Sequence, residues 1–486
     1  MLEKSIIHIP QETKFLILGA GPTGLGAAYR LKELGIEDFI VLERENRVGG
    51  LATSYMDPQG FTWDLGGHIQ FSHYKYFDQL MEKALGKDGW LHHERESWIW
   101  YCDRFIPYPF QNNLRYLPRQ QLWEALKGLI EAKQNRGAVP HNFQQWLESA
   151  FGESVACQFM IPYNTKVWAH PLTQLSYDWV GDRVSVVDWE RALKNVLFEK
   201  DDVSWGPNNK FQFPKRGGTG AIWQAVADLI GHSHIALNSQ VVAIQSLEKT
   251  VTLGSGEKIK YHTLLNTAPL DTFCSAVTDF SPAVKQLANR LQYSSSNIVG
   301  IGLEGPIPEP LVKKCWMYFP AEQYPFYRVT VFSNYSPYNV PNPQKQWSLM
   351  AEVSESGFKP VLQDTVVQDV ITAFEKIGFI NGQCQIVSRW SHRCPHGYPI
   401  PSLDRNELLR EIHPILEKHS MHSRGRFGGW KYEVSNQDHS VMQGVEWVDW
   451  IVLGVPELTY PHPNEANSGV AKESHPAPLA SARRAA

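Results

Sequence analysis

The sequence predicts an α/β chain of several domains, built on a two-layered unit near its N-terminus. Residues 15–18 form a short apolar run typical of a buried strand, and residues 36–43 form a second one. Between them stand a glycine-rich turn and apolar residues at helical spacing, closed by Gly35, where a helix C-terminus often has a glycine. This order of strand, turn, helix and strand predicts a parallel sheet covered by helices.

The turn reads Gly19-x-Gly21-x-x-Gly24, and the second strand ends on Glu43. Such glycines let a pyrophosphate approach the helix N-terminus closely, and the acid accepts hydrogen bonds from a ribose diol. The pattern therefore predicts a dinucleotide site. Residues 44–51 read RENRVGGL, and a basic, Gly-Gly-rich turn after the acid resembles the FAD-binding start of glutathione-reductase and amine-oxidase flavoproteins. The predicted cofactor is FAD, bound in a Rossmann-like domain of the GR2 type.

Length and composition exclude several classes of protein. With 486 residues, 43% of them hydrophobic, the chain is long enough for two or three cores. The net charge of −4 gives no case for nucleic acid or an anionic membrane surface. No apolar run is long enough to span a bilayer, and the first 14 residues lack the pattern of a secretion signal. The six cysteines are scattered, which favours reduced thiols in a cytoplasmic protein.

Changes of pattern divide the chain into segments. Apolar spacing between residues 122 and 150 is helical, with Asn142 as the expected N-cap of one helix. Strands are expected within 240–261, 297–303, 315–319, 326–334 and 347–353. The predicted domains are an FAD-binding domain (1–95, 205–275 and 400–460), a helical insertion (96–204), an antiparallel sheet domain for the substrate (276–399) and a disordered tail (461–486).

Two places stand out as binding candidates. Gly66 and Gly67 allow close approach of a flat ligand, and His68 follows at once. No metal is expected at His68 and His73, because no carboxylate or cysteine nearby in the sequence completes a ligand set. Arg328 stands in a β-type run with few acids nearby, where a charge is costly unless it is paired. We therefore expect a bound dianion as its partner.

From residue 14 to about residue 458 the chain resembles the UDP-galactopyranose mutases of the longer, eukaryotic type. Bacterial mutases share the cofactor motif but are shorter and lack several of the matching stretches. These stretches are GGLATSYMDPQGFTWDLGGHIQFSHYKYF, PYPFQNN, PYNTKVWA, WGPNNKFQFPKRGGTGAIW, CWMYFP, PFYRVTVFSNYSPYN, HGYPIPSLDR and SRGRFGGWKYEVSNQDHS.

The resemblance implies an isomerase, an intramolecular transferase that interconverts UDP-galactopyranose and UDP-galactofuranose with no net redox change. Such an enzyme supplies the galactofuranose precursor for glycan biosynthesis. In this family only reduced flavin is active: its N5 nitrogen attacks the anomeric carbon, UDP leaves, the sugar ring opens and recloses, and UDP returns.

The resemblance also implies roles for individual residues. Arg183 and Arg328 bind the diphosphate, and Arg183 and Asn208 lie in two loops that close over the substrate. His68 lies at the reactive edge of the flavin, and with the two arginines it forms the implied catalytic set. The implied substrate-binding residues are Tyr108, Phe110, Gln111, Phe159, Asn164, Trp168, Arg183, Asn208, Trp316, Tyr318, Arg328, Tyr335, Tyr398 and Tyr432, with Phe159, Phe110 and Gln111 at the uracil. The implied FAD-binding residues are Gly19, Gly21, Thr23, Gly24, Glu43, Gly50, Leu51, Gly66, Gly67, His68, Val241, Arg426, Asn436, Gln437 and Ser440.

Because the flavin must be reduced, NADPH is implied as an external reductant, and Arg95, Ser97 and Arg426 match positions associated with its docking. One residue departs from the family pattern: Ser435 stands where we expect glycine, and a positive φ there would strain a serine. The short N-terminal extension and the Ala-rich tail carry no family motif, which leaves a homo-oligomer open.

Three alternatives stay open. A net oxidoreductase of the amine-oxidase or protoporphyrinogen-oxidase kind would share the fold, but it would need an apolar or cation-accepting aromatic pocket. A flavin protein without activity would bind a nucleotide sugar only. A related enzyme would act on another sugar, such as UDP-N-acetylgalactosamine. The two arginines and the tyrosines favour the mutase.

Overall fold

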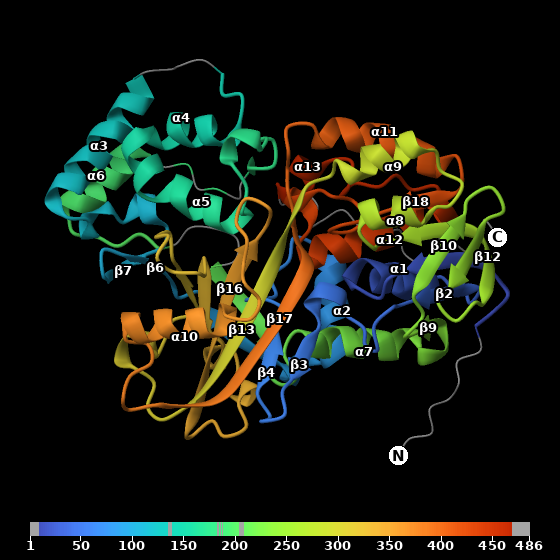
Figure 1. Cartoon of the computed structure of the whole chain (residues 1–486), viewed down its shortest axis with the longest axis horizontal. Helices are drawn as coiled ribbons and strands as arrows, with labels where there is room; N and C mark the ends of the chain where they lie inside the picture. The colour runs from blue at the N-terminus through green and yellow to red at the C-terminus, as the bar shows by residue number, and fades with distance from the viewer. Residues whose placement is uncertain are drawn as a thin grey trace.

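The computed structural model describes residues 9–134, 139–181, 184, 186, 188–203 and 209–468. Three parts lie side by side in Figure 1: a sheet covered by helices on the right, a second sheet at the lower left, and a group of helices above it. Within the described ranges, no helix combines the length and the apolar character needed to cross a membrane.

The first sheet is the predicted cofactor domain. Its strand order is β10-β11-β12-β1-β2-β9, and β18 pairs with β12. Because β1 runs parallel to both β2 and β12, the carboxyl ends of these strands meet at one edge. Its strands are β1 (Glu12–Leu18), β2 (Phe39–Leu42), β9 (Ile235–Ala236), β10 (Val241–Gln245), β11 (Thr250–Leu253), β12 (Lys258–Asn266) and β18 (Met421–Ser423).

Helices cover both faces of this sheet, so its strands are apolar on both sides. One apolar cluster joins α1 (Pro22–Glu33), α2 (Lys75–Leu85), α7 (Gly220–Ile230) and α12 (Gln437–Leu453) to one face. A second cluster joins α8 (Leu270–Ala276), α9 (Pro282–Asn289) and α11 (Arg405–Glu417) to the other. The predicted border at residue 276 is therefore too early, since α9 packs in the cofactor domain.

The second sheet has the strand order β17-β13-β16-β15-β14-β6-β7. Its pairs are antiparallel except β14 with β6, which run parallel, so the sheet is mixed rather than purely antiparallel. β6 and β7 lie within residues 96–204, which were predicted as a helical insertion. The predicted border at residue 96 is therefore wrong as well. The strands are β6 (Ser97–Tyr101), β7 (Arg104–Pro107), β13 (Tyr293–Glu304), β14 (Trp316–Tyr318), β15 (Arg328–Val331), β16 (Gln346–Glu355) and β17 (Gln385–Pro399), and α10 (Val366–Ile377) packs on the sheet.

The helical part consists of α3 (Arg119–Gln134), α4 (Phe143–Val155), α5 (Ile161–Trp168) and α6 (Trp189–Leu197). Asn142 caps α4 as predicted, because its side chain accepts the backbone N–H of Gln145 at 3.0 Å. Two short antiparallel ribbons stand apart from the two large sheets: β3 (Ser54–Met56) with β4 (Thr62–Asp64), and β5 (Trp90–Glu94) with β8 (Lys210–Pro214).

The predicted disordered tail begins with ordered structure. α13 (Pro463–Asn467) follows α12, and Asn467 Nδ2 donates to the backbone carbonyl of Glu433 at 3.0 Å. Disorder is therefore wrong for this stretch, and residues 469–486 lie outside the described residues.

Candidate functional site

The glycine turn between β1 and α1 is packed too tightly for side chains. A Cβ on Gly24 would lie 1.9 Å from the Gly19 carbonyl oxygen, and a Cβ on Gly19, where φ is +100°, would lie 2.5 Å from Thr267 Oγ1. A Cβ on Gly50 would lie 3.2 Å from the Cα of Gly21. The turn thus presents bare backbone at the N-terminus of α1, which fits the pyrophosphate of a dinucleotide.

Glu43 is buried directly after β2. Its Oε2 accepts the N–H of Ala20 at 2.7 Å, and its Oε1 accepts the N–H of Glu45 at 2.9 Å. Burial raises the pKa of Glu43, and these two N–H groups oppose the rise. A carboxylate has about four acceptor sites, so both oxygens can still accept a ribose hydroxyl. Leu51 and Val241 pack against the apolar cluster that lies between the first sheet and α8, α9 and α11.

The loop after β4 brings the cofactor domain against the second sheet. The N–H of Gly67 donates to Glu352 Oε1 at 3.0 Å. A Cβ on Gly67 would lie 2.8 Å from both Thr330 Oγ1 and Trp316 Nε1, so only glycine fits there. Burial lowers the pKa of His68 to about 4, which keeps its imidazole neutral near pH 7. Its Nδ1 has no hydrogen-bond partner in the part of the chain that the structure describes.

Arg328 has a protein carboxylate as its partner, which corrects the expectation that acids are few around it. Its Nε and Nη2 donate to Glu352 Oε1 and Oε2 at 2.6 and 2.7 Å, because β15 and β16 place the two residues directly opposite each other. Tyr327 adds a third donor, its hydroxyl, to Oε2 at 2.7 Å. The Glu352 side chain is 3% exposed and that of Arg328 is 20% exposed. The carboxylate is therefore enclosed, while part of the Arg328 side chain stays accessible.

Burial alone would raise the pKa of Glu352, but the charge and the hydrogen bonds of Arg328 bring it below its usual range. The carboxylate is thus ionised and holds both the cofactor loop, through Gly67, and the arginine of the sheet.

Three buried polar atoms near this pair have no hydrogen-bond partner among the described residues: Trp316 Nε1, Thr330 Oγ1 and the Tyr335 hydroxyl. The Tyr335 ring packs on those of Phe211 and Phe213, at centroid distances of 5.6 and 5.2 Å. Burial raises the pKa of Tyr335, so its hydroxyl keeps its proton. Because an unpaired buried polar group costs about 1–3 kcal/mol, these atoms fit a polar ligand between the sheet and the cofactor domain.

The predicted aromatic residues form two connected groups. In the first, Tyr108 packs on Tyr318 at 5.3 Å, and Phe110 stacks on Phe159 at 4.7 Å. Tyr163 joins these pairs, stacked on Phe159 at 5.3 Å and edge-on to Tyr318 at 5.4 Å. Tyr163 was not among the predicted site residues, although it lies four residues after Phe159 on the same helical face.

The second group surrounds Trp168, at the C-terminus of α5. Its ring is edge-on to Tyr398 at 5.9 Å and to Tyr432 at 4.8 Å, and the Arg426 guanidinium lies 4.8 Å from the Tyr398 ring. Arg426 Nη1 donates to Ser435 Oγ at 2.9 Å. The φ of Ser435 is −120°, so the departure from glycine causes no strain and supplies a hydroxyl that holds Arg426.

Of the other predicted site residues, some are described by the structure and two lie outside the described residues. Asn436 precedes α12 as its N-cap residue, and Gln437 Oε1 accepts Trp223 Nε1 at 3.0 Å. Arg183 and Asn208 lie outside the described residues. Buried or half-buried positions are found for Thr23, Gln111, Asn164 and Ser440.

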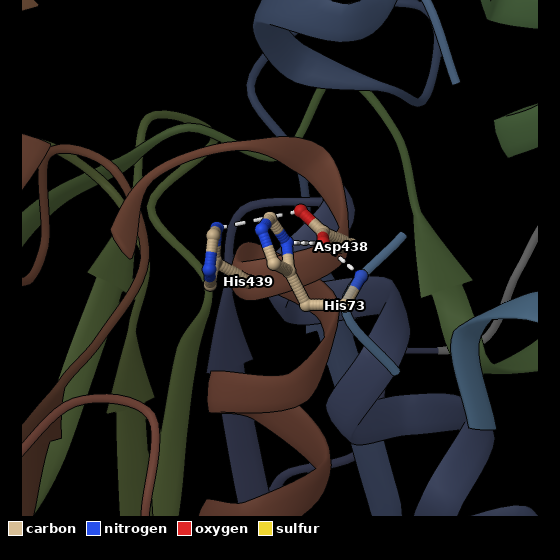
Figure 2. Close-up of side chains that lie close together, drawn as sticks. All are labelled: His73, Asp438 and His439. Carbon is tan, nitrogen blue, oxygen red and sulfur yellow. Dashed lines mark hydrogen bonds and ion pairs between the residues drawn. The ribbon is translucent and has the colours of Figure 1, made fainter. Parts of the chain in front are cut away.

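His73 lies beside a carboxylate that the sequence analysis missed. Its Nδ1 is 2.7 Å from Asp438 Oδ2, and its backbone N–H donates to the same oxygen at 3.0 Å. His439 Nδ1 is 3.4 Å from Asp438 Oδ1, and Figure 2 shows both imidazoles on the same side of the carboxylate, with the His73 ring nearer to it. The centroids of the two rings lie 4.7 Å apart. The three side chains could supply metal ligands within 4.8 Å of one another, so the stated reason for excluding a metal at His73 is wrong.

The surroundings of this group nevertheless stabilise the ionised Asp438 carboxylate and do not favour a bound metal cation. Asp438 stands in the first turn of α12, where the helix dipole favours a negative charge and disfavours a positive one. Burial alone would raise the pKa of Asp438, but His439 and the hydrogen bonds from His73 bring it well below its usual range. We interpret the group as a clamp that ties the loop before α2 to the start of α12.

A family profile covers most of the chain. The family described as flavin containing amine oxidoreductase matches residues 22–415. Among curated proteins, the FAD-dependent oxidoreductase dpchF of Colletotrichum higginsianum is 23% identical over 248 residues, which cover 47% of this chain and 48% of that protein. A Baeyer-Villiger monooxygenase of Streptomyces coelicolor is 39% identical over 69 residues, 14% of this chain and 13% of that protein. The chain thus spans about half or less of the length of these curated relatives.

Solved structures match over nearly the whole chain. The crystal structure of a reduced UDP-galactopyranose mutase is 45% identical, covers 94% of this chain and 97% of its own, and has a TM-score of 0.90. A putrescine oxidase bound to putrescine is 16% identical, covers 91% of this chain and 99% of its own, and has a TM-score of 0.62. At that identity the second likeness shows the fold alone.

Proposed function

The chain belongs to the flavin containing amine oxidoreductase family and, within it, to the UDP-galactopyranose mutases, and from this premise we propose that it interconverts UDP-galactopyranose and UDP-galactofuranose with FAD as its cofactor. The observation that carries the proposal is the position of Glu352. This one carboxylate holds Gly67 of the cofactor loop and Arg328 of the sheet, so an anion-binding guanidinium stands beside the site that fits the flavin.

The residues fit the needs of such a reaction. Reduced FAD supplies the nucleophile, its N5 nitrogen, for the anomeric carbon. Arg328 balances the charge that the diphosphate gains when its bond to the sugar breaks, and it keeps UDP close for return. The hydroxyls of Tyr318, Tyr335, Tyr398 and Tyr432 add donors without adding charge. His68, which is neutral near pH 7, adds no cationic charge, and its imidazole is proposed to position the flavin edge by a hydrogen bond.

The aromatic group of Phe110, Phe159 and Tyr108 is proposed to hold the uridine, since its rings lie together on the helical side of the second sheet. Arg183, proposed at the diphosphate, and Asn208, proposed at the sugar, rest on the resemblance alone, since both lie outside the described residues. We further propose the longer, eukaryotic type of mutase, on the matching sequence stretches given above.

NADPH is proposed as the reductant of the flavin. Arg95 lies 5.3 Å from the Tyr108 ring and Arg426 lies 4.8 Å from the Tyr398 ring, so both guanidiniums border the same aromatic groups. Positive side chains stacked on aromatic rings suit a dinucleotide that carries an additional phosphate. A cytoplasmic location fits the six cysteines, which are all free.

The proposal is tested with purified protein reduced by dithionite, given UDP-galactofuranose, and analysed for UDP-galactopyranose by chromatography. Conversion is expected in the reduced sample and not in an oxidised control. Arg328→Ala should lower kcat/KM by about 100-fold or more, as expected for one transition-state charge contact. The matched control is Arg393→Ala, because Arg393 pairs with Glu355, which lies on the same strand as Glu352, but the Arg393 side chain is 41% exposed. An Arg328→Ala enzyme within about tenfold of the wild type (~1.4 kcal/mol) would contradict the diphosphate assignment.

A further inference from the structure

Lys166 of α5 is a buried lysine bound entirely by backbone carbonyls. Its Nζ donates to the carbonyl oxygens of Phe319, Ala321, Tyr324 and Phe326 at 2.8, 2.8, 2.9 and 2.8 Å. The residue is 5% exposed, and no ion pair found among the described residues includes it. Four carbonyl oxygens around one ammonium form a cation cage, and the protein fills it with its own side chain.

The two elements that meet at this cage carry different parts of the proposed substrate site. α5 carries Asn164 and Trp168, and Phe159 stands just before it. The segment that supplies the four carbonyls, residues 319–327, joins β14 to β15. β14 carries Tyr318, and β15 begins at Arg328. One ammonium therefore connects the helix of the nucleotide side to the turn between two strands of the diphosphate side.

The C-terminal end of α5 is held by serines in and just after β16 of the second sheet. The hydroxyl of Ser354 donates to the carbonyl of Lys166, and the hydroxyl of Ser356 donates to the carbonyl of Ala169. Both serines follow Glu352 closely on the chain, and Glu352 pairs with Arg328. The free carbonyls at the end of a helix need such partners, so α5 is docked at two independent points.

Hydrogen bonding favours a holding role for this lysine over a reactive one. Burial lowers the pKa of Lys166 to about 7, and the neighbouring charges are those of Lys359 and Glu322. The carbonyl oxygens favour the protonated form, because only that form offers three N–H donors to them. Because its N–H groups are all used in hydrogen bonds to these carbonyls, the ammonium holds α5 to the segment between β14 and β15.

We propose that Lys166 is a positioning residue that sets the distance between the nucleotide-binding helix α5 and the strands that bear Tyr318 and Arg328. This proposal rests on the proposed function, since it assumes that UDP spans these two elements. Loss of the ammonium would let α5 shift relative to the sheet, and UDP would then lose simultaneous contact at its base and its diphosphate. The glycine turn and Glu43, which hold the dinucleotide, lie in the other domain, and Glu352 still holds Gly67, so flavin content should be unaffected.

The test measures the Kd for UDP, the KM and kcat for UDP-galactofuranose, and the flavin content of full-length Lys166→Ala. We expect the Kd and KM to rise about tenfold or more, with kcat within threefold and flavin content unchanged. Propylammonium, which replaces the missing three methylenes and ammonium, should restore UDP affinity. Lys314→Ala is the matched control, because Lys314 is also buried but its Nζ lies over the rings of Trp98 and Phe105, at 4.1 and 4.3 Å. It should show neither the loss nor the rescue.

A flavin-loaded Lys166→Ala protein that binds UDP within threefold of the wild type would overturn the proposal. So would propylammonium that restores thermal stability without UDP affinity, because that is a structural effect only. If Lys166→Ala does not fold, Ser356→Ala loosens the other docking point at lower cost. It should weaken UDP binding at least threefold, and unchanged affinity overturns the proposal. Wild-type protein that binds UDP but does not isomerise would refute the proposed function alone, whereas wild-type protein that does not bind UDP would refute both.

Discussion

The buried pair of Arg328 and Glu352 allows a quantitative test with Glu352→Gln. The carboxylate accepts four hydrogen bonds, two at each oxygen. An amide keeps only one acceptor oxygen. The variant should place its NH2 at the Oε2 position, because the Tyr327 hydroxyl can turn and accept there. Arg328 Nη2 then faces a donor, and the guanidinium loses its counter-charge.

The expected cost follows from burial. Breaking a buried ion pair by removing one charge costs about 3–5 kcal/mol, and a single hydrogen bond to a charged group is worth about 1.5–3 kcal/mol. Because Arg328 is 20% exposed and water can reach part of it, we expect the lower end, about 3 kcal/mol. Since Gly67 keeps its acceptor at Oε1, the flavin should stay bound while activity falls.

The assay is urea unfolding followed by flavin fluorescence, together with isomerisation by the reduced enzyme. Glu355→Gln is the matched control on the same strand: Glu355 pairs with Arg393 through two bonds of 2.9 and 3.0 Å, but Arg393 is 41% exposed. A pair of this exposure should cost at most about 1 kcal/mol. If Glu352→Gln costs no more than Glu355→Gln, the reasoning about the buried pair is refuted.

Three further predictions follow from single residues. The pKa of His68 is about 4 in the folded state against an ordinary 6.5, so its share of the stability is complete above pH 6.5 and is lost as the pH falls towards 4; wild-type unfolding free energies should fall more steeply there than those of His68→Asn, by up to about 1.4 kcal/mol per pH unit. Ser435→Gly should loosen Arg426 by removing one of its three hydrogen bonds, since those to the Gly397 carbonyl remain, and should raise the KM for NADPH in a flavin-reduction assay; an unchanged KM would separate this hydrogen bond from the binding of the reductant. Gly67→Ala should lower the ratio of flavin to protein absorbance, because its Cβ would lie 2.8 Å from two side-chain atoms, whereas at Gly357 a Cβ would meet nothing within 4 Å and Gly357→Ala should keep its flavin.

Local features were predictable from the sequence because their causes are local. The glycine turn, the acid after the second strand and the N-cap at Asn142 each depend on a few consecutive residues, and all are found where they were predicted. The family and the mixed α/β flavin fold are confirmed as well.

Contacts that depend on register or on distant segments were missed. Glu352 lies 24 residues after Arg328, and only the antiparallel pairing of β15 and β16 places them opposite each other. Asp438 is 365 residues from His73, so no local pattern could show that a carboxylate stands beside this histidine. The long strand β17 was not predicted at all, because its sequence QIVSRWSHRCPHGYP carries charged residues and prolines that are unusual within a strand.

The central claim is that the flavin enables the isomerisation without being consumed, and turnover per flavin tests it most directly. The protein is reduced once under anaerobic conditions, excess dithionite is removed, and UDP-galactofuranose is added in large excess over the flavin. We expect many molecules of UDP-galactopyranose per flavin, and an absorbance spectrum in which the flavin stays reduced. Product limited to about one equivalent per flavin, with the flavin oxidised at the end, would contradict the account and point to a net oxidoreductase.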